Sequence, residues 1–429
     1  MRTLINNLKE NEETKISGFV EKIRDTKYMV FIILKDISGS IQVSIEKENN
    51  DALLKDVSSI TVGSVVTFEG KMLHSEYVKN GGKEFIPSTI KIESISDPSP
   101  IEESAEIDTR LDYRWIDLRN DKNTLIFKIQ SSLVRSLREY LYDNNFMEIH
   151  TPKLIGTASE SGSEVFEVKY FDRKAYLAQS PQFYKQMAMA AGFDRIFEVG
   201  PVFRAEKSFT NRHSTEFTCL DIEFSYINSF EDVMDLEEKL ITHALKDIEK
   251  EYGQIIEETF DTKVVVPTKP FPRVKLKDLY AEIEKRYGYK VAEEEKNDLT
   301  TEAEKLGCKY AMEEFGSEFL FVTDYEPDKR AFYHMRDEHG KPLGYDLLWR
   351  GVEITTGAQR EHRYEQLKKQ AEEKGLDKDV KFYLEFFKYG CPPHGGFGLG
   401  VDRLTMLLLN LPSLKETEFI FRGPNRLEP

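Results

Sequence analysis

Apolar and polar residues alternate with a period of two along the N-terminal part of the chain. In the stretch MVFIILKD, Val30, Ile32 and Leu34 share one face, and SIQVSI and STIKIES alternate in the same way. This alternation is typical of half-buried strands, and about five such short strands predict a small β-barrel. It leaves Phe31 and Gln42 on the face that points away from the core.

A segment rich in proline, serine and glutamate (SDPSPIEESAEI) follows the barrel and predicts a linker. We therefore expect a barrel domain over 1–95, a linker or hinge over 96–120, and a second domain over 121–429. Apolar residues recur near the helical period over 122–143, which predicts a long amphipathic helix. Further helices, separated by strand-like segments, are predicted near 230–252, 275–288, 297–315 and 358–375, and from Leu399. The predicted fold class is α+β, with helices flanking an antiparallel sheet.

Composition narrows the class of protein. The chain has 429 residues, enough for two or three domains, and the opening MRTLINNLKENEE does not resemble a signal peptide. No apolar run is long enough to cross a membrane. The three cysteines, Cys219, Cys308 and Cys391, are far apart, which favours a reducing cytoplasm over a disulfide framework or thiolate metal site. The net charge of −16 disfavours a protein that binds nucleic acid without sequence preference.

The segment 195–227 contains two alternating stretches around a polar loop. If they pair as a hairpin, Arg204, Phe217 and Asp221 come to one face, and Glu223 continues that face. An arginine can hold a phosphate through two hydrogen bonds, and a neighbouring aromatic ring can stack on a base. The alternative is a solvated hairpin with scattered charges.

A second cluster lies in GYDLLWRGVEITTG. A two-residue turn at Arg350-Gly351 would pair the strands on either side of it. Leu348 would then lie opposite Glu353, and Asp346 would share the face of Leu348. The two carboxylates are suitable ligands for a hard cation such as Mg²⁺. The alternative is a charged surface hairpin.

The third cluster is CPPHGGFGLGVDRL. Four glycines within six residues allow the backbone to approach a ligand closely, and the helix that follows carries Arg403 in its first turn. A helix N-terminus with an arginine suits a triphosphate, although no G-K-[ST] sequence of a P-loop follows. The alternative is a glycine-rich turn with a surface Asp-Arg pair. Together the three clusters predict ATP bound in a bent form and held by arginines and magnesium. The predicted reaction is attack on the α-phosphate, promoted by positioning and charge stabilisation.

These clusters, in this order, resemble the motifs of class II aminoacyl-tRNA synthetases, and within them the aspartate-specific branch of the archaeal and eukaryotic type. FMEIHTPKL resembles the first motif, with Pro152 at a dimer interface, and GPVFRAE through RHSTEFTCLDIE resembles the second. GFGLGVDRL resembles the third. The resemblance covers essentially the whole chain and implies a homodimer with an N-terminal OB-fold domain that binds the anticodon.

The resemblance also implies residue roles at the ATP site. Arg204 would hold the α-phosphate and the carboxylate of the amino acid, Phe217 would stack on adenine, and Arg403 would contact the γ-phosphate. Arg204 and Arg403 are thus the expected catalytic residues. Asp346 and Glu353 would bind Mg²⁺. The full set expected to bind ATP is Arg204, Glu206, His213, Phe217, Glu353 and Arg403.

For the amino-acid substrate, the resemblance rests on the segment QSPQFYKQM. Lys185 and Arg360 would hold the side-chain carboxylate of aspartate from opposite sides, and Asp221 would take its amino group. A neutral amide could not satisfy two buried cations, so asparagine is disfavoured. The alternative for Lys185 is an exposed lysine on a helix. The residues expected to bind aspartate are Glu160, Ser180, Gln182, Lys185, Asp221 and Arg360, with Glu160 on a loop that closes over the substrate.

In the barrel, the resemblance implies that Phe31 stacks on an anticodon base and that Gln42 and Glu84 bond to base edges. The alternative is that Phe31 is simply core or exposed by chance. The implied function is that of a cytoplasmic aspartate–tRNA ligase. It forms aspartyl-adenylate from L-aspartate and ATP, then transfers aspartate to the 3′ end of tRNA(Asp), with tRNA(Asn) left open as a second acceptor. The expected partners are these substrates, Mg²⁺ and a second copy of the chain, with no membrane.

The sequence disfavours three rival functions. An asparaginyl-tRNA synthetase would share the fold and ATP site, but Lys185 argues against it. A catalytically dead synthetase that binds nucleic acid is disfavoured because Arg204, Asp346, Glu353 and Arg403 are all present. A ligase that makes free asparagine is disfavoured by the N-terminal barrel.

Overall fold

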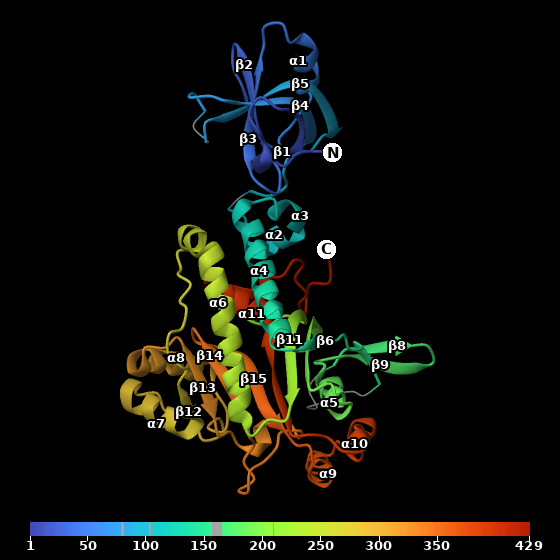
Figure 1. Ribbon diagram of the computed structural model, residues 1–429, viewed down its shortest axis with the longest axis vertical. Helices are drawn as coiled ribbons and strands as arrows, with labels where there is room; N and C mark the ends of the chain where they lie inside the picture. The colour runs from blue at the N-terminus through green and yellow to red at the C-terminus, as the bar shows by residue number, and fades with distance from the viewer. Residues whose placement is uncertain (79–80, 103, 157–164, 209) are drawn as a thin grey trace. The chain divides into compact units, whose positions relative to one another are not determined.

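The computed structural model describes residues 1–429 except 79–80, 103, 157–164 and 209 (Figure 1). The chain divides into two compact units, Met1–Ala105 and Glu106–Pro429, which we describe separately. Among the residues described, none of the helices has both the length and the apolar character needed to cross a membrane.

The first unit is a closed barrel with strand order β1-β2-β3-β5-β4. Val30, Ile32 and Leu34 on β2 are buried in its core while the residues between them are half-buried, so the predicted alternation is confirmed. Its strands are β1 (Glu13–Asp25), β2 (Met29–Lys35), β3 (Ser40–Glu46), β4 (Val65–His74) and β5 (Lys83–Ser94), and its helix is α1 (Asp51–Val57).

The second unit is organised around an eight-stranded sheet with the order β12-β13-β14-β15-β16-β11-β10-β6. The β12–β13 and β10–β6 pairs are parallel and the others antiparallel. The strands are β6 (Met147–Glu148), β10 (Arg195–Phe203), β11 (Glu216–Ser225), β12 (Arg273–Lys275), β13 (Phe319–Thr323), β14 (Gly344–Trp349), β15 (Val352–Arg360) and β16 (His394–Gly400). A smaller sheet contains β7 (Leu154–Ile155), β9 (Arg173–Leu177) and β8 (Glu167–Tyr170).

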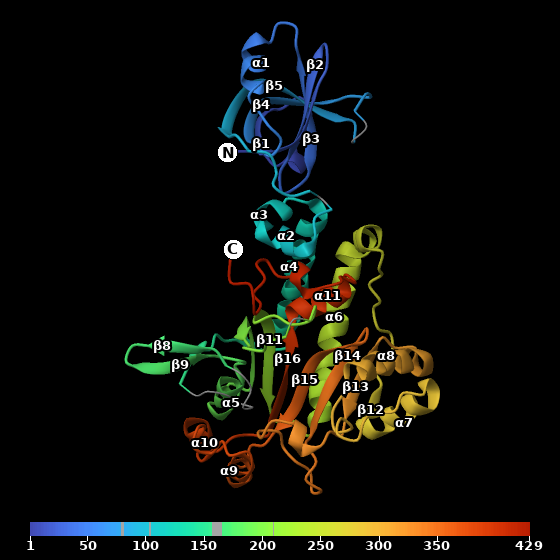
Figure 2. The same ribbon diagram turned by 180° about the vertical axis from the view of Figure 1, so that it is seen from behind.

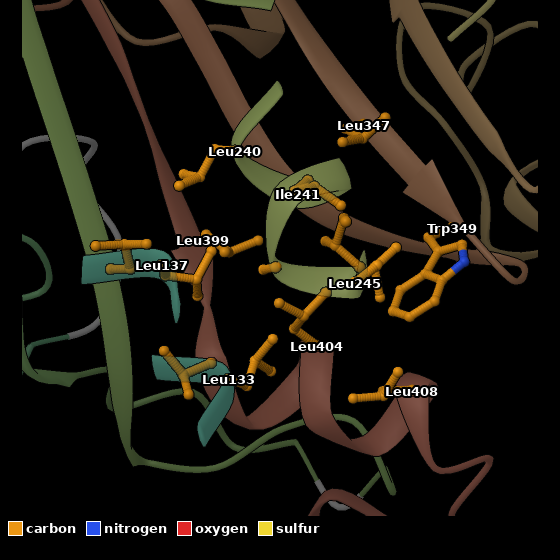
Figure 3. Packing of buried hydrophobic residues seen from close by; sticks show 14 of the residues in the cluster. Leu133, Leu137, Leu240, Ile241, Leu245, Leu347, Trp349, Leu399, Leu404 and Leu408 are labelled. Carbon is orange, nitrogen blue, oxygen red and sulfur yellow. The ribbon is translucent and has the colours of Figure 1, made fainter. Parts of the chain in front are cut away.

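Helices α4 (Asp121–Asp143), α6 (Phe230–Phe260) and α11 (Val401–Leu408) pack against one face of this sheet. Leucines of all three helices belong to the same buried core as Leu347 and Trp349 of β14 (Figure 3). Viewed from behind, the strands lie in front of α6, and this is the face that carries the candidate site (Figure 2). The apolar stripe predicted for α4 is buried, each residue at most 1% exposed: Ile126, Ile129, Leu133, Leu137 and Leu141.

The remaining helices cover the edges of the sheet. Helices α7 (Leu276–Tyr287) and α8 (Thr301–Phe315) form a second core with β13 and β14. An aromatic-rich core joins α5 (Gln182–Ala190), α9 (Tyr364–Glu373) and α10 (Lys381–Phe387). Two short helices, α2 (Ile107–Asp112) and α3 (Arg114–Asp117), begin the second unit, and the buried Arg114 donates to the carbonyls of Glu418 and Phe419 in the C-terminal tail.

Several predicted helices differ from the structure at their ends. The helix predicted near 297–315 begins at Thr301, and the last helix begins at Val401, because Leu399 belongs to β16. The helix that begins at Phe230 runs to Phe260, farther than predicted. The helix predicted over 358–375 begins only at Tyr364, because residues 358–360 extend β15 and pair with both β14 and β16. Sheet pairing on both sides outweighs the helical character of the local sequence there.

The turn between β14 and β15 has the predicted form. Arg350 and Gly351 both have positive φ, 48° and 80°, as a two-residue hairpin turn of the favoured type requires. Leu348 pairs with Glu353, as predicted, and an irregularity between Leu347 and Leu348 shifts the rest of the register.

Candidate active site

The candidate site is built on the sheet face opposite α4 and α6. Along β11, Leu220 and Ile222 enter the main core, so the pleat turns Asp221 and Glu223 to the other face. These two residues are only 4% and 0% exposed. Because a buried charge is costly unless it is paired, each needs a nearby cation, and α5 and β15 supply them.

The first cation is Lys185 on α5. Its side chain is 1% exposed, which excludes the alternative of an exposed helix lysine. Its Nζ lies 2.9 Å from Oδ1 of Asp221 and 3.4 Å from Oε2 of Glu223. Burial alone would lower the pKa of Lys185, but the two carboxylates outweigh it and raise the pKa above its ordinary value. The lysine is therefore held charged and fixed.

The second cation is Arg360 at the end of β15. Its Nε donates to Oε1 of Glu223 at 2.9 Å, and its Nη2 donates to the carbonyl of Gly396, also at 2.9 Å. Burial would raise the pKa of Glu223, but Arg360 and Lys185 lower it below its ordinary value. Glu223 thus bridges the two cations that the sequence predicted on either side of a substrate carboxylate. With Asp221, the pocket holds two cations and two anions.

The glycine at position 396 allows this pocket to be assembled. A Cβ atom there would lie 2.0 Å from the carbonyl oxygen of Ile222 and 2.6 Å from Oε2 of Glu223. Any side chain would push β16 away from β11, where the carboxylates are placed. Close approach of the backbone to its neighbouring strand, rather than to a ligand, thus accounts for this glycine.

The hairpin of β10 and β11 brings the predicted ATP-binding side chains together. The strands pair as predicted, and Cζ of Arg204 lies 5.3 Å from the ring centre of Phe217. Glu206 and His213 are half-buried in the segment between the strands. Burial, followed by the positive charge of Arg403, lowers the pKa of His213, so the imidazole is neutral at pH 7.

The two predicted metal ligands lie on β14 and β15. Asp346 is 2% exposed and is held by Arg330 through two hydrogen bonds, Nη1 to Oδ1 at 2.8 Å and Nη2 to Oδ2 at 2.5 Å. Arg403 donates to the backbone carbonyl of Glu353 at 2.7 Å, and Thr356 donates to the Glu353 side chain at 3.1 Å. Burial and the charge of Asp346 raise the pKa of Glu353 to about 7.

This donor set fits a magnesium ion that arrives with phosphate ligands. Asp346 and Glu353 are close enough to repel one another, and Mg²⁺ is commonly held by one or two carboxylates together with substrate phosphates. Arg330 uses two of the four acceptor positions of Asp346 and leaves two for a metal. Within the described ranges, no group of three or more His, Cys, Asp or Glu residues is suited to a metal.

The three other residues predicted to bind aspartate are Glu160, Ser180 and Gln182. Glu160 falls within 157–164 and lies outside the described residues. Ser180 precedes α5, and its Oγ accepts a hydrogen bond from the backbone nitrogen of Gln182 at 3.1 Å. Gln182 is 4% exposed, and its Nε2 lies 3.5 Å from Oε2 of Glu223, so it borders the cation pair.

In the barrel, the three predicted anticodon-binding residues are half-buried. Gln42 and Glu84 are paired neighbours on β3 and β5. Phe31 lies outside the barrel core, with Cζ of Arg24 4.5 Å from its ring centre. An aromatic ring with an adjacent arginine is compatible with base stacking, and the roles of these residues stay predictions.

Sequence reasoning missed three charged residues at this site. The sequence contained a signal for Glu223, because this residue shares the strand face of Asp221. Arg330 and Glu304 had none, because they come from a loop and from α8. Glu304 lies 3.4 Å from Nη1 of Arg212 and accepts from the backbone nitrogen of Glu353 at 3.3 Å.

The family follows from sequence matches that cover most of the chain. Residues 106–421 match the family described as "tRNA synthetases class II (D, K and N)", and residues 14–93 match the "OB-fold nucleic acid binding domain". The chain belongs to this class II synthetase family and is an aminoacyl-tRNA ligase. The fold class and the family resemblance predicted from the sequence are both confirmed.

Individual relatives are similar over nearly their full length. The aspartate–tRNA(Asp/Asn) ligase of Aeropyrum pernix is 39% identical, covering 97% of this chain and 95% of the relative. The aspartate–tRNA(Asp) ligase of Pyrococcus furiosus is 40% identical, covering 97% and 96%. Among solved structures, an asparaginyl-tRNA synthetase from Pyrococcus horikoshii complexed with asparaginyl-adenylate has a TM-score of 0.90 at 30% identity, covering both chains fully. The aspartyl-tRNA synthetase of Entamoeba histolytica has a TM-score of 0.87 at 31% identity, covering 100% of this chain and 93% of the other.

Proposed function

We propose that this chain is an aspartate–tRNA ligase. It activates L-aspartate with ATP to aspartyl-adenylate and pyrophosphate, and then transfers aspartate to the 3′ end of tRNA(Asp). The observation that carries the proposal is the pair of buried cations, Lys185 and Arg360, both bonded to Glu223. The names of its relatives support the same substrate.

Recognition of aspartate follows from the charges of the pocket. The substrate ammonium group binds Asp221, and the side-chain carboxylate binds Lys185 and Arg360. Glu223 keeps both cations charged and in position before the substrate arrives, so little reorganisation is needed. Asparagine presents a neutral amide in place of the second carboxylate, so it would lose the charge-assisted hydrogen bonds that Lys185 and Arg360 can donate to a substrate carboxylate.

Activation of aspartate depends on positioning. Phe217 stacks on the adenine, with Glu206 at its edge, and Arg204 holds both the α-phosphate and the attacking carboxylate, so the reacting atoms are brought into line. Arg403 holds the γ-phosphate, and His213 assists as a neutral donor. The carboxylate oxygen of aspartate attacks the α-phosphorus, and pyrophosphate leaves. Asp346 and Glu353 would hold a magnesium ion, which would neutralise part of the phosphate charge.

Asparaginyl-tRNA synthetase is the second candidate, because a solved enzyme of that name shares the fold with a TM-score of 0.90. A shared fold does not decide the amino acid, which is selected by the pocket. Lys185 and Arg360 both lie beside the proposed position of the substrate side chain here, and two cationic donors favour a carboxylate over an amide.

The remaining parts of the proposal concern partners and domains. The barrel over 1–95 binds the anticodon through Phe31, Gln42 and Glu84, the segment 96–120 connects it, and the catalytic domain covers 121–429. Two copies associate through the region of α4 and Pro152. The three cysteines are free, which supports a reducing, cytoplasmic location.

Aminoacylation of purified tRNA transcripts tests the whole proposal. The enzyme is expected to attach labelled aspartate to tRNA(Asp) and to leave asparagine unattached to either tRNA(Asp) or tRNA(Asn). Attachment of aspartate to tRNA(Asn) would define a second acceptor, as in the name of the aspartate–tRNA(Asp/Asn) ligase of Aeropyrum pernix. Attachment of asparagine alone would replace the proposal by its rival.

A further inference from the structure

A chain of buried hydrogen bonds runs from Gln182, at the edge of the predicted aspartate pocket, to side chains to which the proposed function gives no role. Its centre is Gln186, which follows Lys185 on α5 and is 0% exposed. Oε1 of Gln186 lies 3.1 Å from Nε2 of Gln182 and 2.9 Å from the hydroxyl of Tyr383. Nε2 of Gln186 lies 3.0 Å from Nε2 of His394, which is also 0% exposed.

The donor and the acceptor of every hydrogen bond in this series follow from the bond that His394 makes to the carbonyl of Pro392. Nδ1 of His394 lies 2.8 Å from the carbonyl oxygen of Pro392, and a carbonyl can only accept, so Nδ1 carries a hydrogen. Burial lowers the pKa of His394 to about 4, against the opposing charge of Glu223, so the ring is neutral. Its Nε2 can then only accept, and Gln186 must turn its NH₂ group toward the histidine.

The orientation of Gln186 in turn determines the orientation of the Gln182 amide. With its NH₂ directed at His394, Gln186 presents its oxygen to Gln182, which must therefore donate with its own NH₂ group. The second hydrogen of that NH₂ faces the Glu223 carboxylate at 3.5 Å, which favours the same orientation. None of the hydrogen bonds in the described part of the chain uses Oε1 of Gln182.

We propose that Gln186 and His394 are positioning residues that orient the Gln182 amide so that its oxygen receives the ammonium group of the amino-acid substrate. The inference rests on the proposed function, which places aspartate beside Gln182. At neutral pH the ammonium group is the only hydrogen-bond donor of aspartate, because its other polar groups are carboxylates. The reversed amide would direct N–H groups at a cation and repel it.

Amino-acid-dependent ATP–pyrophosphate exchange can isolate this effect if succinate is used as an inhibitor. Succinate keeps both carboxylates of aspartate but lacks the ammonium group. Gln186→Met keeps the shape of the side chain and removes its polar group, so the Gln182 amide loses its 3.1 Å hydrogen bond and keeps the longer, 3.5 Å contact with Glu223, which directs it more weakly. We expect the KM for aspartate to rise about 10- to 100-fold, as for the loss of a hydrogen bond to a charged group, while the Ki of succinate and the KM of ATP change less than about three-fold.

Tyr383→Phe is the matched control, because it removes another buried hydrogen bond to Gln186 without altering the direction set by His394. Its KM for aspartate is expected to stay within about three-fold of the wild type. If Gln186→Met is not recovered folded, His394→Leu removes the acceptor that directs Gln186 and should give the same selective rise.

The outcomes separate this inference from the function on which it rests. Equal rises in the KM of aspartate and the Ki of succinate would overturn the orienting role, because a pocket that is merely distorted would weaken both ligands. An effect of Tyr383→Phe equal to that of Gln186→Met would overturn it as well. A wild-type enzyme without aspartate-dependent exchange would instead overturn the proposed function, and this inference with it.

Discussion

Nζ of Lys185 lies 2.9 Å from Oδ1 of Asp221 in a pocket where the two side chains are 1% and 5% exposed. In a buried pair, each charge is stable only while the other is present, because water is not available to replace it. The same lysine also compensates Glu223. The proposed substrate pocket is therefore part of what stabilises the domain.

Replacing this lysine should cost stability as well as activity. Lys185→Met leaves Asp221 and Glu223 with Arg360 as their remaining cation, and we expect the free energy of unfolding to fall by roughly 3–5 kcal/mol. Lys174→Met is a matched control, since Lys174 pairs with Glu167 at 69% and 50% exposure, and should cost less than about 1 kcal/mol. Denaturant unfolding of both variants measures the difference, and equal losses would show that the buried pair has no special role.

The pairing of Arg330 with Asp346 should weaken the binding of a metal ion when no nucleotide is present. Arg330→Met removes a cation bonded to both oxygens of a proposed metal ligand, so Mn²⁺, used as a spectroscopic substitute for Mg²⁺, should bind at least about ten-fold more tightly. Arg336→Met, which removes an arginine paired with the half-exposed Glu373, is the control and should leave binding unchanged. Electron paramagnetic resonance of free Mn²⁺ gives the affinities. Equal affinities in the Arg330 variant and the wild type would contradict the proposed metal ligands.

Glu237 should make stability depend on pH. This carboxyl of α6 is buried beneath β14 and β15, where it accepts hydrogen bonds from Tyr345 and Thr355, and burial raises its pKa to about 8. Between pH 4.5 and 8 the unfolded chain releases this proton while the folded protein keeps it, so rising pH lowers the free energy of unfolding until both forms are ionised.

Glu237→Gln removes this dependence. The free energy of unfolding of the variant, relative to the wild type, should increase by roughly 2–5 kcal/mol from pH 4.5 to 8. Unfolding at pH 5, 6.5 and 8 tests this, with the exposed Glu258→Gln on the same helix as the control. A constant difference across that range would show that Glu237 is ionised in the folded protein at pH 5.

Gly396 should tolerate no side chain. Gly396→Ala places a methyl group 2.0 Å from the carbonyl oxygen of Ile222, so we expect a loss of about 1–3 kcal/mol or more and a large loss of aspartate activation. At Gly400 the nearest atom would lie 3.6 Å away, an ordinary contact, so Gly400→Ala should leave the thermal unfolding temperature nearly unchanged. Thermal unfolding of the two alanine variants compares them, and similar temperatures would contradict the close approach of the strands.

The parts of the fold that follow from local periodicity could be predicted from the sequence. The alternation at Val30, Ile32 and Leu34 gave the barrel strands, and the stripe from Ile126 to Leu141 gave α4. The end of β15 could not be predicted in this way, because residues 358–360 are held as a strand by neighbours on both sides.

The candidate site also has parts that could be predicted from the sequence and parts that could not. The strand pleat places Phe217 and Asp221 on one face of β11, and the hairpin brings Arg204 beside Phe217, so pairing of the two strands was enough to predict this arrangement. The bond from Arg330 to Asp346 depends on a loop whose path has no periodic signal, and the link from Gln186 to His394 joins residues 208 positions apart. Contacts of this kind arise from tertiary packing and become visible only in the folded chain.

The central claim is that Lys185 and Arg360 select aspartate by its side-chain carboxylate. ATP–pyrophosphate exchange without tRNA, with aspartate and asparagine compared under the same conditions, tests it most directly. We predict exchange with aspartate, none above background with asparagine, and loss of the aspartate signal in Lys185→Ala. Exchange with asparagine alone would contradict the claim and leave Lys185 without its proposed ligand, and no exchange with either amino acid would favour a catalytically inactive synthetase.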